Sequence, residues 1–313
     1  MIGDFLMKEN KLNFIVDKQI KDMKIKEYLK FNRKLSGRMI RLAAREGRIS
    51  VNNKKVNLSY VLNSGDSIEI LISRDESQNI EPEDIDLDVV YEDEDIIVLN
   101  KQPGIVVHPT KSHPTGTISN GLANYYKEKG ENCIVRLVSR LDRDTSGLLL
   151  LAKNQFAHMS LARDMNLDSF QKEYTAVVHG NLLKRAGTVN EPIYRPLHDS
   201  IKRIVDERGQ ESITHYEVLN SYKNGDVVRL KLETGRTHQI RVHLTYLGHP
   251  IFGDSLYCNY NDDNYILRQA LHANKLTFPH PRTGKLMKIE VDLPQDMKNL
   301  IELLKEDKSI NTK

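Results

Sequence analysis

Two aspartates flanked by arginines form the densest group of potentially reactive side chains in the sequence. They lie in VSRLDRDTSGLLLLAK, residues 138–153, where Asp142 and Asp144 alternate with Arg140 and Arg143. This polar loop runs directly into an apolar strand, so its side chains would be held at the end of a rigid element. A nearby cation favours the ionised form of a carboxylate, which is the form that nucleophilic or basic chemistry uses. A purely structural turn, capped and held by salt bridges, would need the same residues. The loop alone therefore leaves open whether it is a reactive site or a structural turn.

A second candidate segment, LETGRTHQIRVHLTYLGHPIFGD, covers residues 232–254. A strand is expected to end near Gly235 and a helix to follow, with Arg236 at the junction. His238 and His243 could suggest a metal, but their spacing of five puts them on different helix faces, and no HExxH motif or cysteine pair accompanies them. The arginines at the start of this helix therefore favour handling of an anion.

Two further segments are weak when each is taken alone. NKQPGIVVHPT, residues 100–110, suggests a strand that leads into a Pro-Gly turn. SFQKEYTAVVHG, residues 169–180, places Tyr174 at the start of a strand. A tyrosine in such a strand is more often part of the core than of an active site.

The elements that must position these residues alternate between strands and helices from residue 89 onward. Short strand patterns recur with turn signals between them, and helical patterns intervene near 117–127, 155–165 and 237–247. This texture predicts a largely antiparallel α+β domain, a mixed sheet with helices packed on it. We expect it to extend over 89–300, with a polar tail at 301–313.

The N-terminal part has a different composition. The spacing predicts a helix over Lys18–Phe31 and a second helix that Ser36 caps and that ends before Gly47. A hairpin at Asn52-Asn53 and a closing strand after Gly65-Asp66 complete a compact module, residues 14–75. On the second helix three arginines fall on one face and form a plausible surface for phosphates: Arg38, Arg41 and Arg45.

Overall composition excludes several classes of protein. The 313 residues are 39% hydrophobic and 28% charged, which fits a folded protein of about two domains. No apolar run approaches the roughly 18 residues that span a bilayer, and the first residues lack a signal-peptide pattern. The two cysteines form no framework. We therefore expect a cytoplasmic protein with reduced thiols and no membrane partner, and nothing in the sequence requires more than a monomer.

Charge is divided into blocks that the net value of +3 conceals. Residues 20–55 carry twelve Lys and Arg against three acids, whereas residues 75–95 carry eleven acids and no Lys or Arg. The basic block indicates a module directed at a polyanion, although two solvated faces of opposite sign would look the same. The acidic residues 76–88 are expected to form a linker.

The basic module has a resemblance to a known domain. LSGRMIRLAAREGRISVNNKKVNLSYVLNSGDSIEI is similar to the RNA-binding domain named after ribosomal small-subunit protein four, and the similarity covers about a fifth of the chain. The resemblance implies that structured RNA is the polyanion.

A longer resemblance covers about two thirds of the chain. The ordered motifs NKQPGIVVHP, SRLDRDTSGLLLLAK, KEYTAVVHG, TGRTHQIRVHLTYLGHPIFGD and LHANKLTFPHPRTG closely resemble the RluA-type family of pseudouridine synthases. A domain of the protein-four type ahead of the catalytic domain is a familiar arrangement there. One position departs from the pattern: Ser139 stands where that family most often has His before "RLD".

The resemblance implies a reaction and roles for four residues. The bond between uracil and ribose is broken, the base turns, and it reattaches through a ring carbon, with no cofactor, metal or energy input. Asp142 would be the nucleophile or base, and Arg236 the arginine that pairs with it. Arg140 would take the place of the flipped base and hold the RNA backbone. Tyr174 would stack on the uracil, with a hydroxyl able to take the ring-carbon proton.

The implied substrate is large-subunit ribosomal RNA, with transfer RNA as the alternative. Two other functions compete with this one. An RNA-binding ribosome assembly factor without catalysis would keep the basic module but need not keep the four site residues intact. A glycoside hydrolase using Asp142 and Asp144 would need two carboxylates facing one sugar, which their spacing disfavours.

Overall fold

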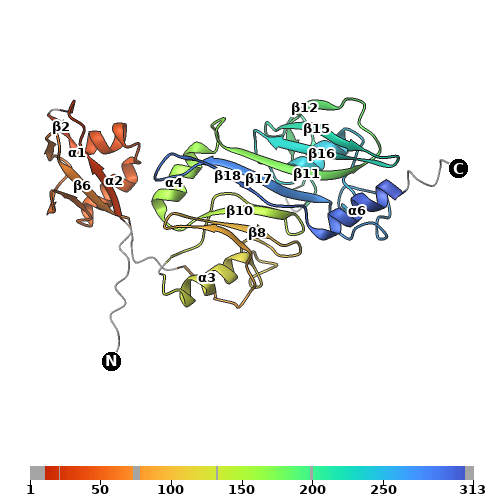
Figure 1. Ribbon diagram of the computed structural model, residues 1–313, viewed down its shortest axis with the longest axis horizontal. Helices are drawn as coiled ribbons and strands as arrows, with labels where there is room; N and C mark the ends of the chain where they lie inside the picture. The colour runs from red at the N-terminus through yellow and green to blue at the C-terminus, as the bar shows by residue number, and fades with distance from the viewer. Residues whose placement is uncertain (1–10, 21, 73–77, 132, 198–199, 307–313) are drawn as a thin grey trace.

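The computed structural model describes residues 11–20, 22–72, 78–131, 133–197 and 200–306. Figure 1 shows a small N-terminal module at one end of the long axis and a larger body built on one long sheet. No helix in these ranges is both long enough and apolar enough to cross a bilayer.

The N-terminal module is a four-stranded antiparallel sheet with helices packed on it. The strand order is β1-β6-β3-β4, and the core is formed by side chains from all of these elements. The sheet strands are β1 (Lys11–Ile15), β3 (Ile49–Val51), β4 (Lys54–Lys55) and β6 (Ser67–Leu71). The other elements are the pair β2 (Met23–Lys24) and β5 (Val61–Leu62), α1 (Ile25–Glu27), the π-helical turn Tyr28–Asn32 and α2 (Gly37–Arg45).

The second predicted helix of this module is confirmed. The Ser36 hydroxyl accepts a hydrogen bond from the Met39 backbone N–H at 3.1 Å, which is an N-cap. Gly47 follows the helix at φ +64°, the left-handed conformation that ends helices. Asn52 and Asn53 both have positive φ, as expected of the two central residues of a tight hairpin turn.

The first predicted helix is largely wrong. Only residues 25–32 are helical, in place of Lys18–Phe31. A turn at Asp17–Ile20 and the positive φ of Asp22 interrupt the chain, and Met23 then pairs with Leu62 in a short strand. The module also begins earlier than expected, because β1 starts at Lys11 and pairs with β6.

Residues 78–88, expected to act as a linker, pack on the larger body. The Gln78 side chain accepts from the Val135 N–H at 2.7 Å and donates to its carbonyl at 3.3 Å. Ile85 and Leu87 lie against Gly121, where an added Cβ would come within 3.0 and 3.2 Å of their side chains. This acidic segment is therefore an extended strap across α3 (Ile118–Glu128).

The larger body is a ten-stranded sheet in which the expected mainly antiparallel α+β architecture is confirmed. The order is β12-β15-β16-β11-β17-β10-β8-β7, with β18 beside β17 and β9 beside β10. The strands are β7 (Val89–Glu92), β8 (Ile96–Lys101), β9 (Arg136–Leu137), β10 (Ser146–Ala152), β11 (Gln171–His179), β12 (Ala186–Asn190), β15 (Ile213–Ser221), β16 (Gly225–Leu232), β17 (Leu271–Pro279) and β18 (Leu286–Glu290).

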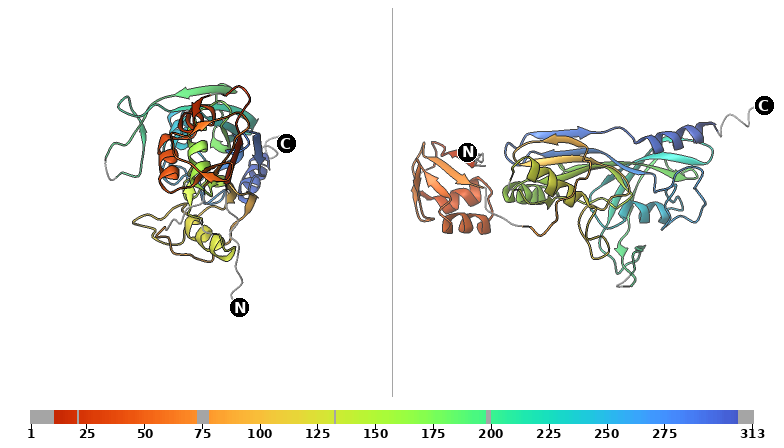
Figure 2. Two further views of the ribbon diagram at one scale, coloured as in Figure 1. Left: turned by 90° about the vertical axis from the view of Figure 1, so that its left-hand side faces the viewer. Right: turned by 90° about the horizontal axis from the view of Figure 1, so that it is seen from below.

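Helices cover this sheet where the sequence predicts them. The three helices expected within the domain are α3, α4 (Gln155–Asp164) and α5 (Gln239–Tyr246). A fourth, α6 (Gln295–Glu306), includes residues 301–306, which were expected to belong to the polar tail, and residues 307–313 lie outside the described ranges. A separate hairpin, β13 (Ile193–Tyr194) with β14 (Ile204–Val205), projects from the body (Figure 2).

The centre of the sheet holds its one parallel pairing among the described strands, between β10 and β17. Gly147 makes this contact possible, since a Cβ there would lie 2.2 Å from the Ala273 carbonyl oxygen, and its φ of +108° suits only glycine. All seven residues of β10 are buried. Leu148 and Leu150 face one apolar cluster, and Leu149 and Leu151 face another. The loop that precedes β10 therefore rests on the most buried strand of the body.

Candidate active site

The loop that carries Asp142 is held by two buried basic side chains, Lys101 and Arg268. Lys101 Nζ donates to the carbonyls of Gln102, Ile105 and Arg143 at 2.9, 3.0 and 2.7 Å, and burial lowers the pKa of Lys101 to about 7. Arg268 donates to the Asp144 carbonyl at 3.0 Å. These bonds fix the backbone that directly follows Asp142, at Arg143 and Asp144.

Arg241, and not Arg236, forms the ion pair with Asp142. Arg241 Nη1 lies 3.1 Å from Asp142 Oδ2. The Nε and Nη2 atoms of the same guanidinium donate to the two oxygens of Asp254, each at 2.7 Å. The pairing expected for Arg236 is therefore wrong: Arg236 is exposed and its Nε donates to the Glu211 carbonyl at 3.1 Å.

The position of Arg241 follows from the way α5 begins. His238 adopts a left-handed conformation with φ 57°, and the helix starts at the next residue. Gln239 then accepts from the Arg236 N–H at 2.9 Å, which folds the preceding turn back over the helix start. Arg241 thus enters the body, where its side chain is 7% exposed.

The electrostatics of this pair keep Asp142 beside a permanent cation. Burial lowers the pKa of the Arg241 guanidinium, but hydrogen bonds and charge from Asp254 and Asp142 outweigh burial and raise it above its ordinary value. Asp254 is itself fully buried and also accepts the N–H groups of Leu256 and Tyr257, both at 3.1 Å. Asp142 remains 29% exposed and is the end of this network that faces the pocket.

A row of hydrogen bonds leads from Arg203 to His238, whose ring faces Asp142. The Arg203 backbone N–H donates to the Tyr257 hydroxyl oxygen at 2.9 Å, and a backbone N–H can only donate. The Tyr257 hydroxyl proton is then available for His238 Nδ1, 2.9 Å away. Burial lowers the pKa of His238, which favours the neutral ring. When the Tyr257 hydroxyl donates to Nδ1, the proton of the neutral ring sits on Nε2, 3.8 Å from Asp142 Oδ2.

These groups line a small pocket that is open to solvent. Asp142 supplies its one carboxylate. Tyr174 forms part of the wall and is 8% exposed, and burial together with the charge of Asp142 raises the pKa of its hydroxyl. The full lining is Arg140, Leu141, Asp142, Thr145, Tyr174, Leu232, Arg236, His238, Gln239, Ile240, Arg241 and Leu271.

The structure brings four of the predicted site residues to this pocket and leaves three elsewhere. Asp142, Tyr174, Arg140 and Arg236 all line it, the two arginines as exposed side chains. The remaining three lie in the N-terminal module on the exposed face of α2, opposite the buried Met39, Ile40 and Ala43: Arg38, Arg41 and Arg45. Ser139 is half-buried and does not belong to the pocket lining.

The second aspartate of the loop points elsewhere. Asp144 pairs with Arg143 at 3.0 Å and lines a different hollow. The two carboxylates do not share a pocket, which is contrary to what a glycoside hydrolase needs.

Four residues of this network were not predicted as members of the site: Arg241, Asp254, His238 and Tyr257. The first three lie within the motif TGRTHQIRVHLTYLGHPIFGD that was singled out. The feature that could have identified Arg241 from the sequence is its position inside the helix, where a side chain can be buried. Arg236 precedes the helix.

Comparison with known proteins agrees with this geometry. Residues 95–246 match the family model described as RNA pseudouridylate synthase. The chain is 43% identical over 257 residues to the uncharacterized RNA pseudouridine synthase YjbO of Bacillus subtilis, covering 82% of this chain and 90% of the relative. It is 39% identical over 255 residues to ribosomal large subunit pseudouridine synthase D of Haemophilus influenzae, covering 78% of each.

A solved structure shares the fold. Human RNA pseudouridylate synthase domain containing 4 superposes with a TM-score of 0.58 at 24% identity, covering 70% of this chain and 93% of that one. With the pocket geometry and the relatives taken together, the chain belongs to the RluA-type family of RNA pseudouridine synthases and is an enzyme of that family.

Proposed function

We propose that this enzyme converts specific uridines of large-subunit ribosomal RNA to pseudouridine, with Asp142 initiating cleavage of the glycosidic bond. The observation that carries the mechanism is the single carboxylate of the pocket, held by Arg241 at 3.1 Å in a lining that also contains Tyr174. Several relatives at 37–40% identity are named for the large ribosomal subunit, which supports this RNA as the substrate.

The arrangement supports a division of labour among the lining residues. Arg241 orients Asp142 and places a positive charge beside its carboxylate. The ring of Tyr174 stacks on the extruded uracil. Arg140, exposed at the mouth, fills the space that the base leaves and holds the backbone. His238, with its proton on Nε2, is a positioning residue that faces the same carboxylate oxygen as Arg241.

The raised pKa of Tyr174 changes one proposed role. A neutral phenol with a raised pKa is a poor base. In the balanced reaction the N1–C1′ bond breaks, the C5–C1′ bond forms, N1 gains a proton and C5 loses one. We assign the acceptance of the C5 proton to Asp142, the one carboxylate in the lining, and leave Tyr174 the stacking role.

The N-terminal module is proposed to bind the same RNA. Its exposed α2 face presents Arg38, Arg41 and Arg45, and its sequence resembles the RNA-binding domain of ribosomal small-subunit protein four. Phosphate contacts of this kind give affinity and register, and leave recognition of the uridine to the pocket.

Release of tritium from C5-labelled uridine tests the reaction and its central residue together. Large-subunit RNA, small-subunit RNA and transfer RNA are purified separately from a strain that lacks the gene. Each is incubated with wild-type protein, Asp142→Asn and the matched control Asp144→Asn. We expect release from large-subunit RNA by wild type and Asp144→Asn only.

Three outcomes would overturn parts of the proposal. Release from transfer RNA alone would replace the substrate. Full activity of Asp142→Asn would exclude the proposed role of that carboxylate. Tight RNA binding by the wild type without release from any fraction would favour an assembly factor.

A further inference from the structure

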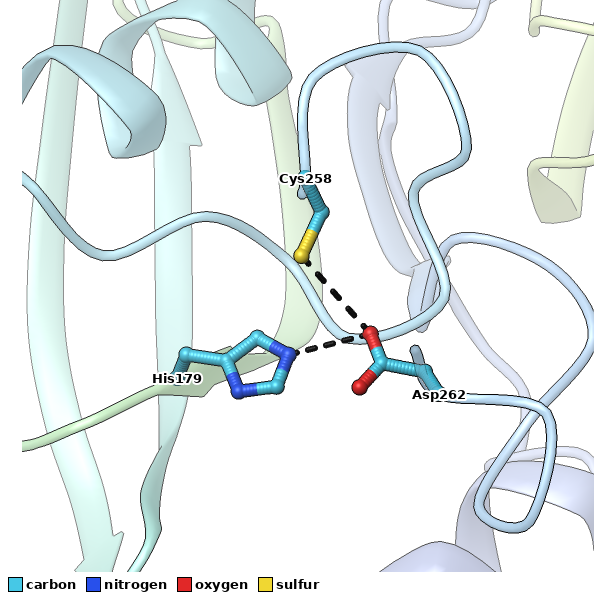
Figure 3. A group of neighbouring side chains, drawn as sticks. All are labelled: His179, Cys258 and Asp262. Carbon is cyan, nitrogen blue, oxygen red and sulfur yellow. Dashed lines mark hydrogen bonds and ion pairs between the residues drawn. The ribbon is translucent and has the colours of Figure 1, made fainter. Parts of the chain in front are cut away.

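A second group of reactive side chains lies outside the pocket, where β11 meets the loop that follows α5. Figure 3 shows His179, at the end of β11, facing Cys258 and Asp262 of that loop. His179 Nε2 lies 3.0 Å from Asp262 Oδ2, and Cys258 Sγ lies 3.7 Å from the same oxygen. One nitrogen, one sulfur and one oxygen atom therefore converge within 4.8 Å of one another.

The Asp262 carboxylate of the cluster is buried and has no lysine or arginine partner. Within the described ranges, no lysine or arginine forms an ion pair with any of the three members, and the Asp262 carboxylate is 5% exposed. Its Oδ2 also accepts the Gly253 N–H at 2.7 Å. A similar group, Asp93, Asp95 and His280, differs because Arg282 binds Asp95 through both carboxylate oxygens at 2.7 and 2.9 Å.

The distances fit a tetrahedral metal ion. Zinc binds His nitrogen and carboxylate oxygen at about 2.0–2.2 Å and thiolate sulfur at about 2.3 Å, so tetrahedral geometry separates nitrogen and oxygen by about 3.4 Å and sulfur and oxygen by about 3.6 Å. The observed sulfur–oxygen separation of 3.7 Å matches this geometry, and the nitrogen–oxygen separation of 3.0 Å would have to lengthen slightly when an ion enters. Phe252 stacks on the His179 ring at 3.6 Å between centroids, and Tyr260 approaches it at 4.4 Å, so the ring plane is already set.

We propose that His179, Cys258 and Asp262 bind a zinc ion, with water in the fourth position. A thiolate and a carboxylate together carry two negative charges, which a divalent ion neutralises, and imidazole, thiolate and carboxylate are all ligands that zinc accepts. The proton of the Cys258 thiol is released to solvent on binding.

The proposed ion would connect β11 to the loop after α5, and residues of the same loop bind side chains that line the pocket. Cys258 and Asp262 follow Asp254, which binds Arg241, and Tyr257, which binds His238. His179 ends the strand that carries Tyr174. Zinc would thus join the loop and the strand at a point outside the pocket lining. The proposal is independent of the substrate and of the reaction.

Cobalt absorption tests the site without any enzyme assay. Protein is dialysed against a chelator, then against metal-free buffer, and titrated with Co²⁺, which reports thiolate ligation by a charge-transfer band. We expect one equivalent to produce the band in wild type and in the matched control Cys133→Ser, which replaces the other cysteine. Cys258→Ser should lose the band, and Zn²⁺ should displace Co²⁺ from wild type.

Thermal unfolding supplies a second reading. Zinc at 100 times its dissociation constant should stabilise wild type and Cys133→Ser, because a ligand of the native state raises the unfolding temperature. His179→Gln and Asp262→Asn should lose most of this shift, and circular dichroism before heating verifies that they are folded. Absence of the cobalt band in wild type would overturn the proposal, as would an unchanged band in Cys258→Ser.

Discussion

Arg241 is shared by two carboxylates of different kinds. Asp254 is buried and binds two of its nitrogens, whereas Asp142 is partly exposed and binds the third. The buried partner fixes the guanidinium, and the guanidinium in turn fixes the carboxylate that faces the pocket. Arg236 lines the same pocket but binds only a backbone carbonyl.

Replacing the two arginines in turn separates these roles. Arg241→Gln leaves Asp254 buried without its cation, which costs about 3–5 kcal/mol of stability, and removes the charge beside Asp142. We expect kcat to fall about 100-fold or more and the unfolding temperature to drop. Arg236→Gln should raise KM for RNA and change kcat less than about threefold. A loss of kcat in Arg236→Gln equal to that in Arg241→Gln would contradict the observed pairing.

The chain from Arg203 to His238 allows a test of the assigned ring proton. Tyr257→Phe removes the hydroxyl that donates to Nδ1, and His238→Asn removes the ring while an Asn tolerates the left-handed backbone. Each should lower kcat by up to about tenfold, the value of the hydrogen bond that orients the His238 ring beside Asp142. The double variant should be little worse than either one, since both act through one contact. Additive losses would show that the two residues act separately.

At the scale of elements, the parallel contact between β10 and β17 supports the loop of Asp142 from behind. Gly147→Ala would place a methyl group against the Ala273 carbonyl at a φ of +108°. We expect a loss of at least about 3 kcal/mol in the free energy of unfolding, measured in urea. The matched control is Gly116→Ala, whose φ is +69° but whose added Cβ meets no atom within 4 Å. It should lose only about 1 kcal/mol, and equal losses would exclude the close strand contact as the cause.

The same pair of strands contains a buried histidine that predicts sensitivity to acid. His272 Nδ1 lies 2.9 Å from the Ser146 hydroxyl, and burial followed by the charge of Arg268 lowers the pKa of His272 to about 4. The unfolded chain, with a pKa near 6.5, binds the proton first as pH falls. Stability should therefore decrease by about 1–2 kcal/mol between pH 6.5 and 5 through this group. His272→Gln should have a shallower dependence of unfolding free energy on pH, and an unchanged dependence would contradict the assignment.

Some helices and strands could be predicted from their own residues, whereas others depend on contacts with distant parts of the chain. The helix capped by Ser36 was predictable because its cap, apolar face and final glycine are all within the segment itself. The helix expected from Lys18 fails because Met23 finds a strand partner 39 residues away, which spacing cannot reveal. Residues 78–88 were expected to form a linker because most of them are charged or polar. The few apolar residues among them pack against the larger body.

The same limit applies to the pocket. Asp142, Tyr174 and Arg140 could be placed by their motifs, but the partner of Asp142 could not. Arg236 and Arg241 lie within six residues of each other, and either could pair with Asp142. Which of them does so depends on the left-handed turn at His238 and on a contact between residues 99 positions apart in the sequence.

At the scale of the whole molecule, the two bodies contact each other directly. Phe156 and Met159 of α4 pack against the core of the N-terminal module, and the Ser36 hydroxyl donates to Met159 Sδ at 3.6 Å. Arg282 binds Asp95 of the larger body and the Lys11 carbonyl of the module. The arginine face of α2 is therefore carried by a module attached to the catalytic body.

The three exposed arginines of α2 predict how the affinity of the protein for RNA depends on salt concentration. Replacing all three exposed arginines of α2 with Gln should lower affinity for the substrate RNA and reduce the slope of log K against log salt by about 2–3, since each lost phosphate contact contributes about 0.7–0.9. Binding is measured by fluorescence anisotropy over a salt series, and kcat at saturating RNA should stay near the wild-type value. The control replaces Lys298 and Lys305 on α6. An equal loss of slope there would indicate a nonspecific effect of charge.

Because β10 pairs with β17, a strand much later in the chain, the N-terminal module and the pocket are completed at different times during synthesis. The module core is complete once residue 72 has emerged. The pocket, in contrast, needs Arg241 and Asp254, and Arg268, which holds the Asp142 loop, is paired with Asp296. At 5–20 residues per second, roughly 10–45 s separate these two points. If the module binds RNA as proposed, each new molecule can hold RNA well before it can modify any, and a chain interrupted in between would occupy its substrate without acting on it.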